Sequence, residues 1–331
     1  MSGIIEFDQV SKEFPGAIRP AVNQVSLDVQ EGHLVVLLGP SGCGKTTLMK
    51  MVNRLYEPTG GQIRVGGTEI HKLKVTELRR KIGYVIQQVG LFPHMRISKN
   101  IGVVPKMLGW DNKRVEKRVD ELLELVGLSP AEYRSRYPGQ LSGGQQQRVG
   151  LARALAADPS IMLMDEPFAA IDNITRTRLQ DELIRIQRTV RKTILFVTHD
   201  VEEAIKLADE IVIMEDGKLI QYDSPLNILT NPANEFVARL TGANDVLRRL
   251  SLQTVGSIML PPANETSRNL KQVSKDTDLR DALALLLSSQ EEELTVIDEN
   301  GQRVGRLTLD GLRSQTQPVS QVAVSAKTTE N

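Results

Sequence analysis

Short runs of consecutive apolar residues recur along the chain and predict buried β-strands. They cover residues 34–38, 161–164, 193–197 and 211–214. Unbroken apolar runs are typical of strands that are covered on both faces. Because helical stretches and turn signals bound these runs, the pattern predicts an α/β fold built on a parallel sheet. Shorter strands are expected near residues 4–10, 25–29 and 63–65.

A helical segment interrupts the predicted sheet. Residues 115–126 place Val115, Val119 and Leu122 on one face at helical spacing. Helical patterns alone fill about residues 90–155, so we expect an inserted helical subdomain there. The Asn-Pro pair at 231–232 and Gly242 are typical of a domain end. The first domain is therefore predicted over residues 1–243.

A second, smaller module is expected over residues 250–312. Its pattern predicts an amphipathic helix at 276–289, a strand at 293–298, a turn at 299–301 and a second strand at 304–308. Residues 313–331 are rich in Gln, Ser, Thr and Val and contain few large apolar groups. Such a composition cannot build a core, so this tail is expected to be disordered.

Charge balance and cysteine content restrict the classes of function. The 331 residues include 41 Lys and Arg and 41 Asp and Glu, a formal net charge of zero. Because nucleic-acid-binding domains usually carry a basic excess, no nucleic-acid partner is expected. Cys43 is the single cysteine, which fits a reducing compartment. With no signal-peptide pattern and no apolar run near ~20 residues, we expect a soluble protein that needs a partner chain at any membrane.

Residues 39–46 match the phosphate-binding loop G-x-x-x-x-G-K-[ST] at every required position. The loop lies between the predicted strand 34–38 and a predicted helix at 47–55, which is the context that the motif requires. A chance Gly-rich turn is the alternative. The residues expected to bind nucleotide are Phe14, whose role is explained below, and the loop residues Gly39, Pro40, Ser41, Gly42, Cys43, Gly44, Lys45, Thr46 and Thr47.

The loop residues have distinct expected roles. Its glycines let backbone N–H groups face phosphate oxygens, and the start of the following helix favours anions. Lys45 can reach the β- and γ-phosphates, and the Thr46 hydroxyl can ligate Mg²⁺. The expected ligand is therefore MgATP.

A second anion site is predicted at residues 142–145. Ser142 and Gln145 have capping-box spacing at the head of a helix. Gly143 and Gly144 are poor helix formers, which makes sense where a ligand approaches the backbone closely. An ordinary capped helix is the alternative, although the two glycines would then be a needless cost.

A third signal is the acidic pair at the end of the apolar run 161–164. Asp165 would hold Mg²⁺ from the side opposite Thr46, and Glu166 would lie next to the γ-phosphate and orient or deprotonate a water. A pair of acidic residues at a strand end is common by itself. Together with a phosphate loop, the pair predicts ATP hydrolysis.

The order of these motifs resembles that of the nucleotide-binding subunit of ABC transporters, over about residues 4–245. The resemblance implies a P-loop NTPase sheet with antiparallel N-terminal strands. It also implies that Phe14 stacks on adenine, although a core role for this ring stays open. By the same resemblance Gln87 senses Mg²⁺ and the attacking water, and His199 touches the γ-phosphate. The metal ligands would be Thr46, Gln87 and Asp165.

The resemblance also implies a dimer. In a head-to-tail pair, residues 142–145 of one copy would close over ATP held by residues 39–47 of the other, and Asp172 would contact the opposite site. Because the chain has one phosphate loop and one such helix start, it needs a second copy or a similar chain. Integral membrane permease subunits would be direct partners, an extracytoplasmic solute-binding protein an indirect one, and the location the cytoplasmic face of the cell membrane.

Several stretches resemble the ATPase subunits of osmoprotectant importers, the glycine betaine, carnitine and choline group. They are residues 51–55, 78–88, 90–94 and 100–110. These stretches surround the expected permease groove and do not touch the solute, so the solute follows by analogy alone. Import of another small polar solute, a non-transport ABC ATPase and a regulatory module with an inactive site are the alternatives.

Residues 250–312 resemble a single cystathionine-β-synthase-type (CBS) module. The order of residues 255–259, the helix and the strand–turn–strand matches that family. The expected ribose pattern Thr-x-x-Asp would run from Thr308, but position 311 is Gly and Asp310 comes one residue early. Nucleotide sensing and ligand-free dimerisation therefore both stay open.

Overall fold

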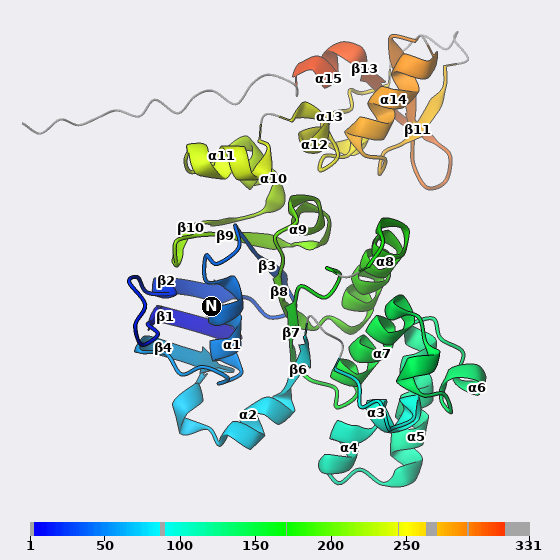
Figure 1. Cartoon of the computed structure of the whole chain (residues 1–331). Coiled ribbons are helices and arrows are strands. Elements are labelled where there is room, and N and C mark those ends of the chain that lie inside the picture. Colours follow the sequence, from blue (N-terminus) through cyan, green and yellow to red (C-terminus); the bar gives the residue numbers. More distant parts are fainter. Residues whose placement is uncertain are drawn as a thin grey trace, which may run out of the picture. The chain divides into compact units, whose positions relative to one another are not determined.

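The computed structural model describes residues 3–86, 90–169, 171–243, 245–262, 270–289 and 291–314. The chain forms two compact units, of which the first is Met1–Ser224 and the second begins at Pro225. Figure 1 shows the elements of both units, coloured along the sequence. The expected end of the first domain at residue 243 stays a prediction. The expected disordered tail lies outside the described residues from 315 onward.

The first unit is built on a six-stranded sheet with the order β10-β9-β3-β8-β7-β6. All its strands are parallel except β10, which is antiparallel to β9. The strands are β3 (Leu34–Leu38), β6 (Ile82–Val85), β7 (Ile161–Asp165), β8 (Thr193–Val197), β9 (Glu210–Glu215) and β10 (Lys218–Asp223). The predicted parallel sheet is confirmed. Every residue of β3, β7 and β8 is buried, as unbroken apolar runs require.

A smaller antiparallel sheet lies beside the helix that follows β3. Its order is β2-β1-β4-β5, from β1 (Ile5–Lys12), β2 (Val22–Val29), β4 (Gly60–Val65) and β5 (Thr68–Glu69). Alternate residues of β1 and β2 enter a core that also contains α1 (Lys45–Val52). The expected antiparallel N-terminal strands are thereby confirmed. The short 3₁₀ turn η1 (Ile70–Lys72) and α2 (Val75–Lys81) lead back to β6.

Among its described residues, the segment expected to be helical contains helices and connecting turns but no strand. The helices are α3 (Ile97–Ile101), α4 (Val103–Met107), α5 (Asn112–Leu125), α6 (Pro130–Tyr133), η2 (Pro138–Gln140) and α7 (Gly143–Leu155). Figure 1 shows these helices gathered at one side of the large sheet. Buried Asn100 orders the chain ahead of them, because its side chain bonds both the N–H and the carbonyl of Phe92. Two further helices, α8 (Asn173–Val190) and α9 (Val201–Leu207), follow β7 and β8.

The second unit contains a three-stranded sheet with the order β11-β12-β13 and its own apolar core. Its elements are α10 (Pro225–Thr230), α11 (Glu235–Thr241), α12 (Val246–Leu250), α13 (Val255–Ile258), β11 (Gln272–Ser274), α14 (Leu279–Ser289), β12 (Glu293–Ile297), β13 (Arg303–Thr308) and α15 (Leu309–Ser314). The predicted helix and strand–turn–strand are present. In the turn, Asp298 accepts backbone hydrogen bonds from Asn300 and Gln302, and these bonds lower the pKa of its carboxyl.

A membrane-spanning helix is absent from the described residues, because none of their helices is both long and apolar enough.

Candidate functional site

The phosphate loop connects the end of β3 to the start of α1. Gly39 and Gly44 adopt φ values of +154° and +106°, which side chains rarely allow. A Cβ atom would lie 2.2 Å from the carbonyl oxygen of Met214 at the first position and 2.2 Å from that of Ala21 at the second. These two glycines are therefore required by close backbone packing as well as by the turn.

Lys45 is folded into the loop. Its Nζ donates to the carbonyl oxygens of Gly39 at 2.6 Å and Pro40 at 2.9 Å, and its side chain is buried. Burial raises the pKa of the neighbouring Cys43 thiol, while the Lys45 charge opposes that rise. The loop thus holds its own cation where phosphate oxygens are expected to lie.

Thr46, in the first turn of α1, directly contacts Asp165 at the end of β7. The Thr46 hydroxyl donates to Asp165 Oδ1 at 2.8 Å. Burial raises the pKa of the Asp165 carboxyl, and the Thr46 bond and Lys50 act against that rise. Two oxygen atoms that could ligate a metal therefore lie side by side next to the phosphate loop. Mg²⁺ prefers oxygen ligands of this kind.

Glu166 and His199 lie close together. Glu166 directly follows β7, and His199 comes shortly after the neighbouring strand β8. His199 Nδ1 is 3.3 Å from Glu166 Oε1. Glu166 has a positive φ of 45°, unusual for a residue with a side chain, and its N–H bonds the Val197 carbonyl at 3.0 Å. Backbone strain of this kind persists only where surrounding structure enforces it. The adjacent strands β7 and β8 therefore bring the Glu166 and His199 side chains together.

The predicted capping box at the start of α7 is confirmed. Ser142 Oγ accepts from Gln145 N at 3.3 Å, and Gln145 Oε1 accepts from Ser142 N at 3.0 Å. The Gln145 amide also donates to the Tyr133 hydroxyl at 3.0 Å. Among the described residues, no hydrogen bond joins this helix start to the phosphate loop. Within one chain, the two anion sites are separate features.

The two glycines of that helix start have different causes. A Cβ atom at Gly143 would meet nothing within 4 Å, so the space beside this residue is open. A Cβ atom at Gly144 would lie 2.7 Å from Thr175 Cγ2 on α8. Ligand approach was the expected reason for both glycines; the structure gives helix packing as a reason for the second.

Asp172 caps α8, because its side chain accepts from Thr175 N at 3.0 Å. These Thr175 hydrogen bonds lower the pKa of the Asp172 carboxyl. Gln87 lies outside the described residues, as does Ala170 in the loop before Asp172. Their expected roles stay predictions.

The Phe14 ring is half-buried rather than part of the core. It meets Tyr56 edge-on with ring centroids 5.3 Å apart, and Lys12 Nζ lies 5.2 Å from its centroid. A core role was the alternative for this residue. The partial exposure of the ring favours a base-stacking role.

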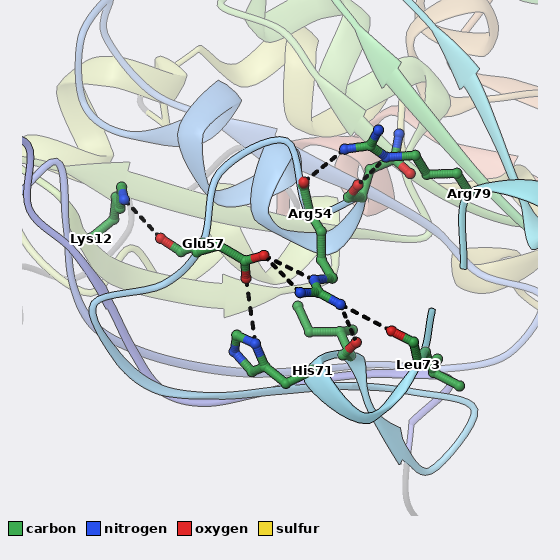
Figure 2. Close-up of polar contacts among 8 residues, drawn as sticks. Lys12, Arg54, Glu57, His71, Leu73 and Arg79 are labelled. Carbon is green, nitrogen blue, oxygen red and sulfur yellow. Dashed lines mark hydrogen bonds and ion pairs between the residues drawn. The ribbon is translucent and has the colours of Figure 1, made fainter. Parts of the chain in front are cut away.

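A polar cluster that sequence reasoning missed joins β1, the segment that follows α1, η1 and α2 (Figure 2). Arg54 donates twice to Glu57 Oε1, at 3.0 and 2.8 Å, and His71 Nδ1 lies 3.4 Å from Glu57 Oε2. Lys12 Nζ donates to the Glu57 carbonyl at 2.7 Å, while Arg79 donates to the Arg54 carbonyl at 2.8 Å. The cluster fixes the end of α1 against the segment that leads to β6. Arg54 and Glu57 are three residues apart, but Lys12, His71 and Arg79 are far from them in the sequence, so no local pattern marks the cluster.

Comparisons with known proteins agree with this geometry. A family model described as ABC transporter matches residues 22–169. The glycine betaine/carnitine/choline transport ATP-binding protein OpuCA of Bacillus subtilis is 49% identical over 89% of this chain and 76% of its own length. The glycine betaine uptake system ATP-binding protein YehX of Escherichia coli is 47% identical over 93% of this chain and 99% of its own.

A third relative and a solved structure give the same result. The osmoprotectant import ATP-binding protein OsmV of Salmonella typhimurium is 44% identical over 91% of this chain and 78% of its own. The dimeric structure of a post-hydrolysis state of an ATP-binding cassette, bound to ADP and phosphate, is similar with a TM-score of 0.60 and 32% identity. That match covers 67% of this chain and 98% of the cassette. The chain therefore belongs to the ABC transporter family, as an ATP-binding subunit whose ATP hydrolysis is coupled to transport.

Proposed function

We propose that this chain powers uptake of an osmoprotectant, a quaternary amine such as glycine betaine, through a separate membrane permease. The support is identity of 44–49% over most of the chain to relatives that are named for import of such solutes. Import of another small polar solute remains the alternative.

Growth tests this proposal. Cells that lack their own osmoprotectant uptake should grow at high salt with external glycine betaine when this chain is made with its permease and solute-binding partners. The Glu166→Gln variant should not rescue growth. Rescue by other small polar solutes, but by no quaternary amine, would favour the alternative.

The site residues support a specific division of labour. Lys45 would leave the loop carbonyls for the β- and γ-phosphates, and Glu166 would orient or deprotonate the attacking water while His199 contacts the γ-phosphate. Thr46 and Asp165 would hold Mg²⁺, and Gln87 would complete the set. When bound, the ion neutralises charge on the phosphate oxygens. Among the described residues, no three His, Cys, Asp or Glu side chains gather as a metal site, so the ion would take its other ligands from phosphates and water.

Subunits of this family work as dimers with separate membrane permease components. We infer that Ser142, Gly143, Gly144 and Gln145 of one copy cover the nucleotide of the other, and that Asp172 meets the opposite site. Three features support this inference. The start of α7 is exposed and capped, the space beside Gly143 is open, and, among the described residues, no hydrogen bond joins this helix start to the phosphate loop of the same chain. A peripheral place on the cytoplasmic face of the cell membrane follows from a permease partner.

A groove between α2, α4 and α7 supports the permease contact. Its volume is about 290 Å³, and its walls include Arg79, Arg80, Arg153, Phe92 and Val104. Burial lowers the pKa of Arg153. Because water is partly excluded there, the attraction between the Arg153 guanidinium and an incoming carboxylate would be weakly screened. We propose that a cytoplasmic permease segment with an acidic residue docks here.

Charge reversal in this groove should separate docking from hydrolysis. We expect Arg80→Glu to lose the permease complex, because like charges across an interface cost several kcal/mol. The isolated chain should keep its ATP turnover, since Arg80 is exposed and lines the groove rather than the proposed nucleotide site. Co-purification with the permease measures the effect, and the control is Lys113→Glu at an exposed position of α5. An intact Arg80→Glu complex would place docking elsewhere.

We propose that residues 250–312 form a CBS-like module that regulates transport. The ribose role of Thr308 finds little support, because Thr308 Oγ1 accepts from Gly311 N at 3.1 Å and Asp310 pairs with Arg313 at 3.1 Å. Glu293 pairs within the module, 3.1 Å from Arg306. We propose instead a response to ionic strength through pairing with the second copy.

Truncation tests this role. A chain that ends at Ala243 should keep ATP turnover, since all proposed catalytic residues lie in the first unit, and should lose its response to internal salt. Surface charges are screened over ~10 Å at 0.1 M salt, so a salt response needs only a modest charged interface. The measurement is uptake in vesicles at stepped internal salt. Identical profiles for full-length and truncated chains would remove the regulatory role.

A further inference from the structure

Arg176 lies in the first turn of α8 and reaches two separate loops. Its NH2 group donates to the Ile171 carbonyl at 3.0 Å, in the loop that precedes α8. Its NH1 group lies 3.7 Å from Asp200 Oδ2, in the loop that follows β8. The planar guanidinium holds both partners in one fixed geometry. One side chain thus joins the residue before Asp172 to the residue after His199.

The Asp200 end of this link is rigid. Asp200 Oδ1 accepts from the N–H groups of Glu202 and Glu203 at 2.9 and 3.2 Å, which caps α9. Asp200 N donates to Thr198 Oγ1 at 3.0 Å. Because both neighbours of His199 are held in this way, a shift of Asp200 must carry His199 with it.

Buried Glu203 on α9 connects this helix to α8, which carries Arg176. Its side chain is 5% exposed and accepts from Gln180 Nε2 at 3.2 Å. A cavity of about 60 Å³ separates these groups from the catalytic edge, and Glu166, His199, Arg176 and Glu203 line it. That space is large enough for side chains or several waters to rearrange. The Arg176 guanidinium thus joins the two loops beside a cavity into which side chains can shift.

We propose that Arg176 is a positioning residue, which transmits the approach of the second copy from the Asp172 loop to His199. The inference rests on the roles proposed above for Asp172 and His199. Contact of the partner with Asp172 would set the Ile171 carbonyl, the guanidinium would carry that setting to Asp200, and His199 would then face the γ-phosphate. Arg176 itself touches no nucleotide.

Steady-state ATP turnover by the full-length chain tests the proposal. Arg176→Met should lower kcat at least ~10-fold, since small misplacements of catalytic groups cost up to ~10²-fold, and should leave KM for MgATP unchanged. Arg176→Lys should recover part of kcat, because an ammonium can hold one partner but lacks the fork. Arg178→Met, on the exposed face of the same helix, is the matched control. The double variant Glu166→Gln, Arg176→Met should still dimerise with ATP.

A double-mutant cycle with Asp200→Asn identifies the path. Asn still caps a helix but removes the charge, so Arg176→Met should cost little further kcat in that background. Additive losses would overturn the proposal. So would a kcat equal to that of Arg178→Met, or a parallel fall of kcat, nucleotide affinity and thermal stability, which would indicate support of the fold alone. A wild-type chain without MgATP turnover would instead contradict the proposed site.

Discussion

Glu166→Gln is expected to lower ATP turnover ~10²–10⁴-fold, the contribution of one well-placed general base or water-orienting group. Its carboxylate follows Asp165 directly and lies 3.3 Å from His199 Nδ1. The amide keeps the size of the side chain but cannot accept the proton of the attacking water. Nucleotide affinity should therefore be retained while kcat collapses. Steady-state turnover and equilibrium binding of labelled ATP measure the two effects separately.

Lys45→Ala provides the contrast to that variant. Loss of the ammonium removes charge from the β- and γ-phosphates, so nucleotide affinity itself should fall. Near-normal turnover by Glu166→Gln would remove Glu166 from the catalytic role. Unchanged affinity in Lys45→Ala would count against the phosphate loop as the nucleotide site.

Ser142→Arg is expected to abolish the closed dimer that Glu166→Gln forms with ATP. The exposed Ser142 side chain caps α7, and a long cationic side chain there would occupy the space in which the second copy's nucleotide is proposed to lie. Sizing chromatography in ATP should show a dimer for Glu166→Gln and a monomer for the double variant. ATP binding to the monomer should persist, because the phosphate loop is intact.

Ser129→Arg is the matched control for this experiment. Ser129 also precedes a helix in the same helical segment and is exposed, but it has no proposed nucleotide contact. It should leave the ATP-dependent dimer intact. A dimer that persists in Ser142→Arg would contradict a composite site shared between two copies.

The strands with unbroken apolar runs could be predicted because burial on both faces leaves a mark in each strand separately. The edge strands β6 and β10 were missed. In β10 no residue is fully buried, and β6 is only four residues long, so neither carries that pattern. β11, three residues long, was missed for the same reason. Such strands are stabilised by pairing with neighbouring strands, and the local sequence does not indicate which strands those are.

The residues proposed to face the nucleotide could be brought together from the sequence because phosphate chemistry constrains adjacent positions. Thr46 and Asp165 are far apart in the sequence, yet each follows a recognisable strand, and they meet at 2.8 Å. Arg54, Arg79 and Arg176 could not be found in this way. Each donates to a backbone carbonyl, an acceptor that every residue carries, so no side-chain pattern reveals the partner. Gly144 similarly owes its identity to Thr175 on another helix.

Uptake into vesicles tests the central claim most directly. Permease and solute-binding partners would be reconstituted with this chain, ATP enclosed on its side, and labelled glycine betaine supplied on the other. The account predicts uptake that requires ATP, stops with Glu166→Gln and is reduced by competing quaternary amines. ATP hydrolysis that proceeds in the assembled complex without uptake of any quaternary amine would contradict it.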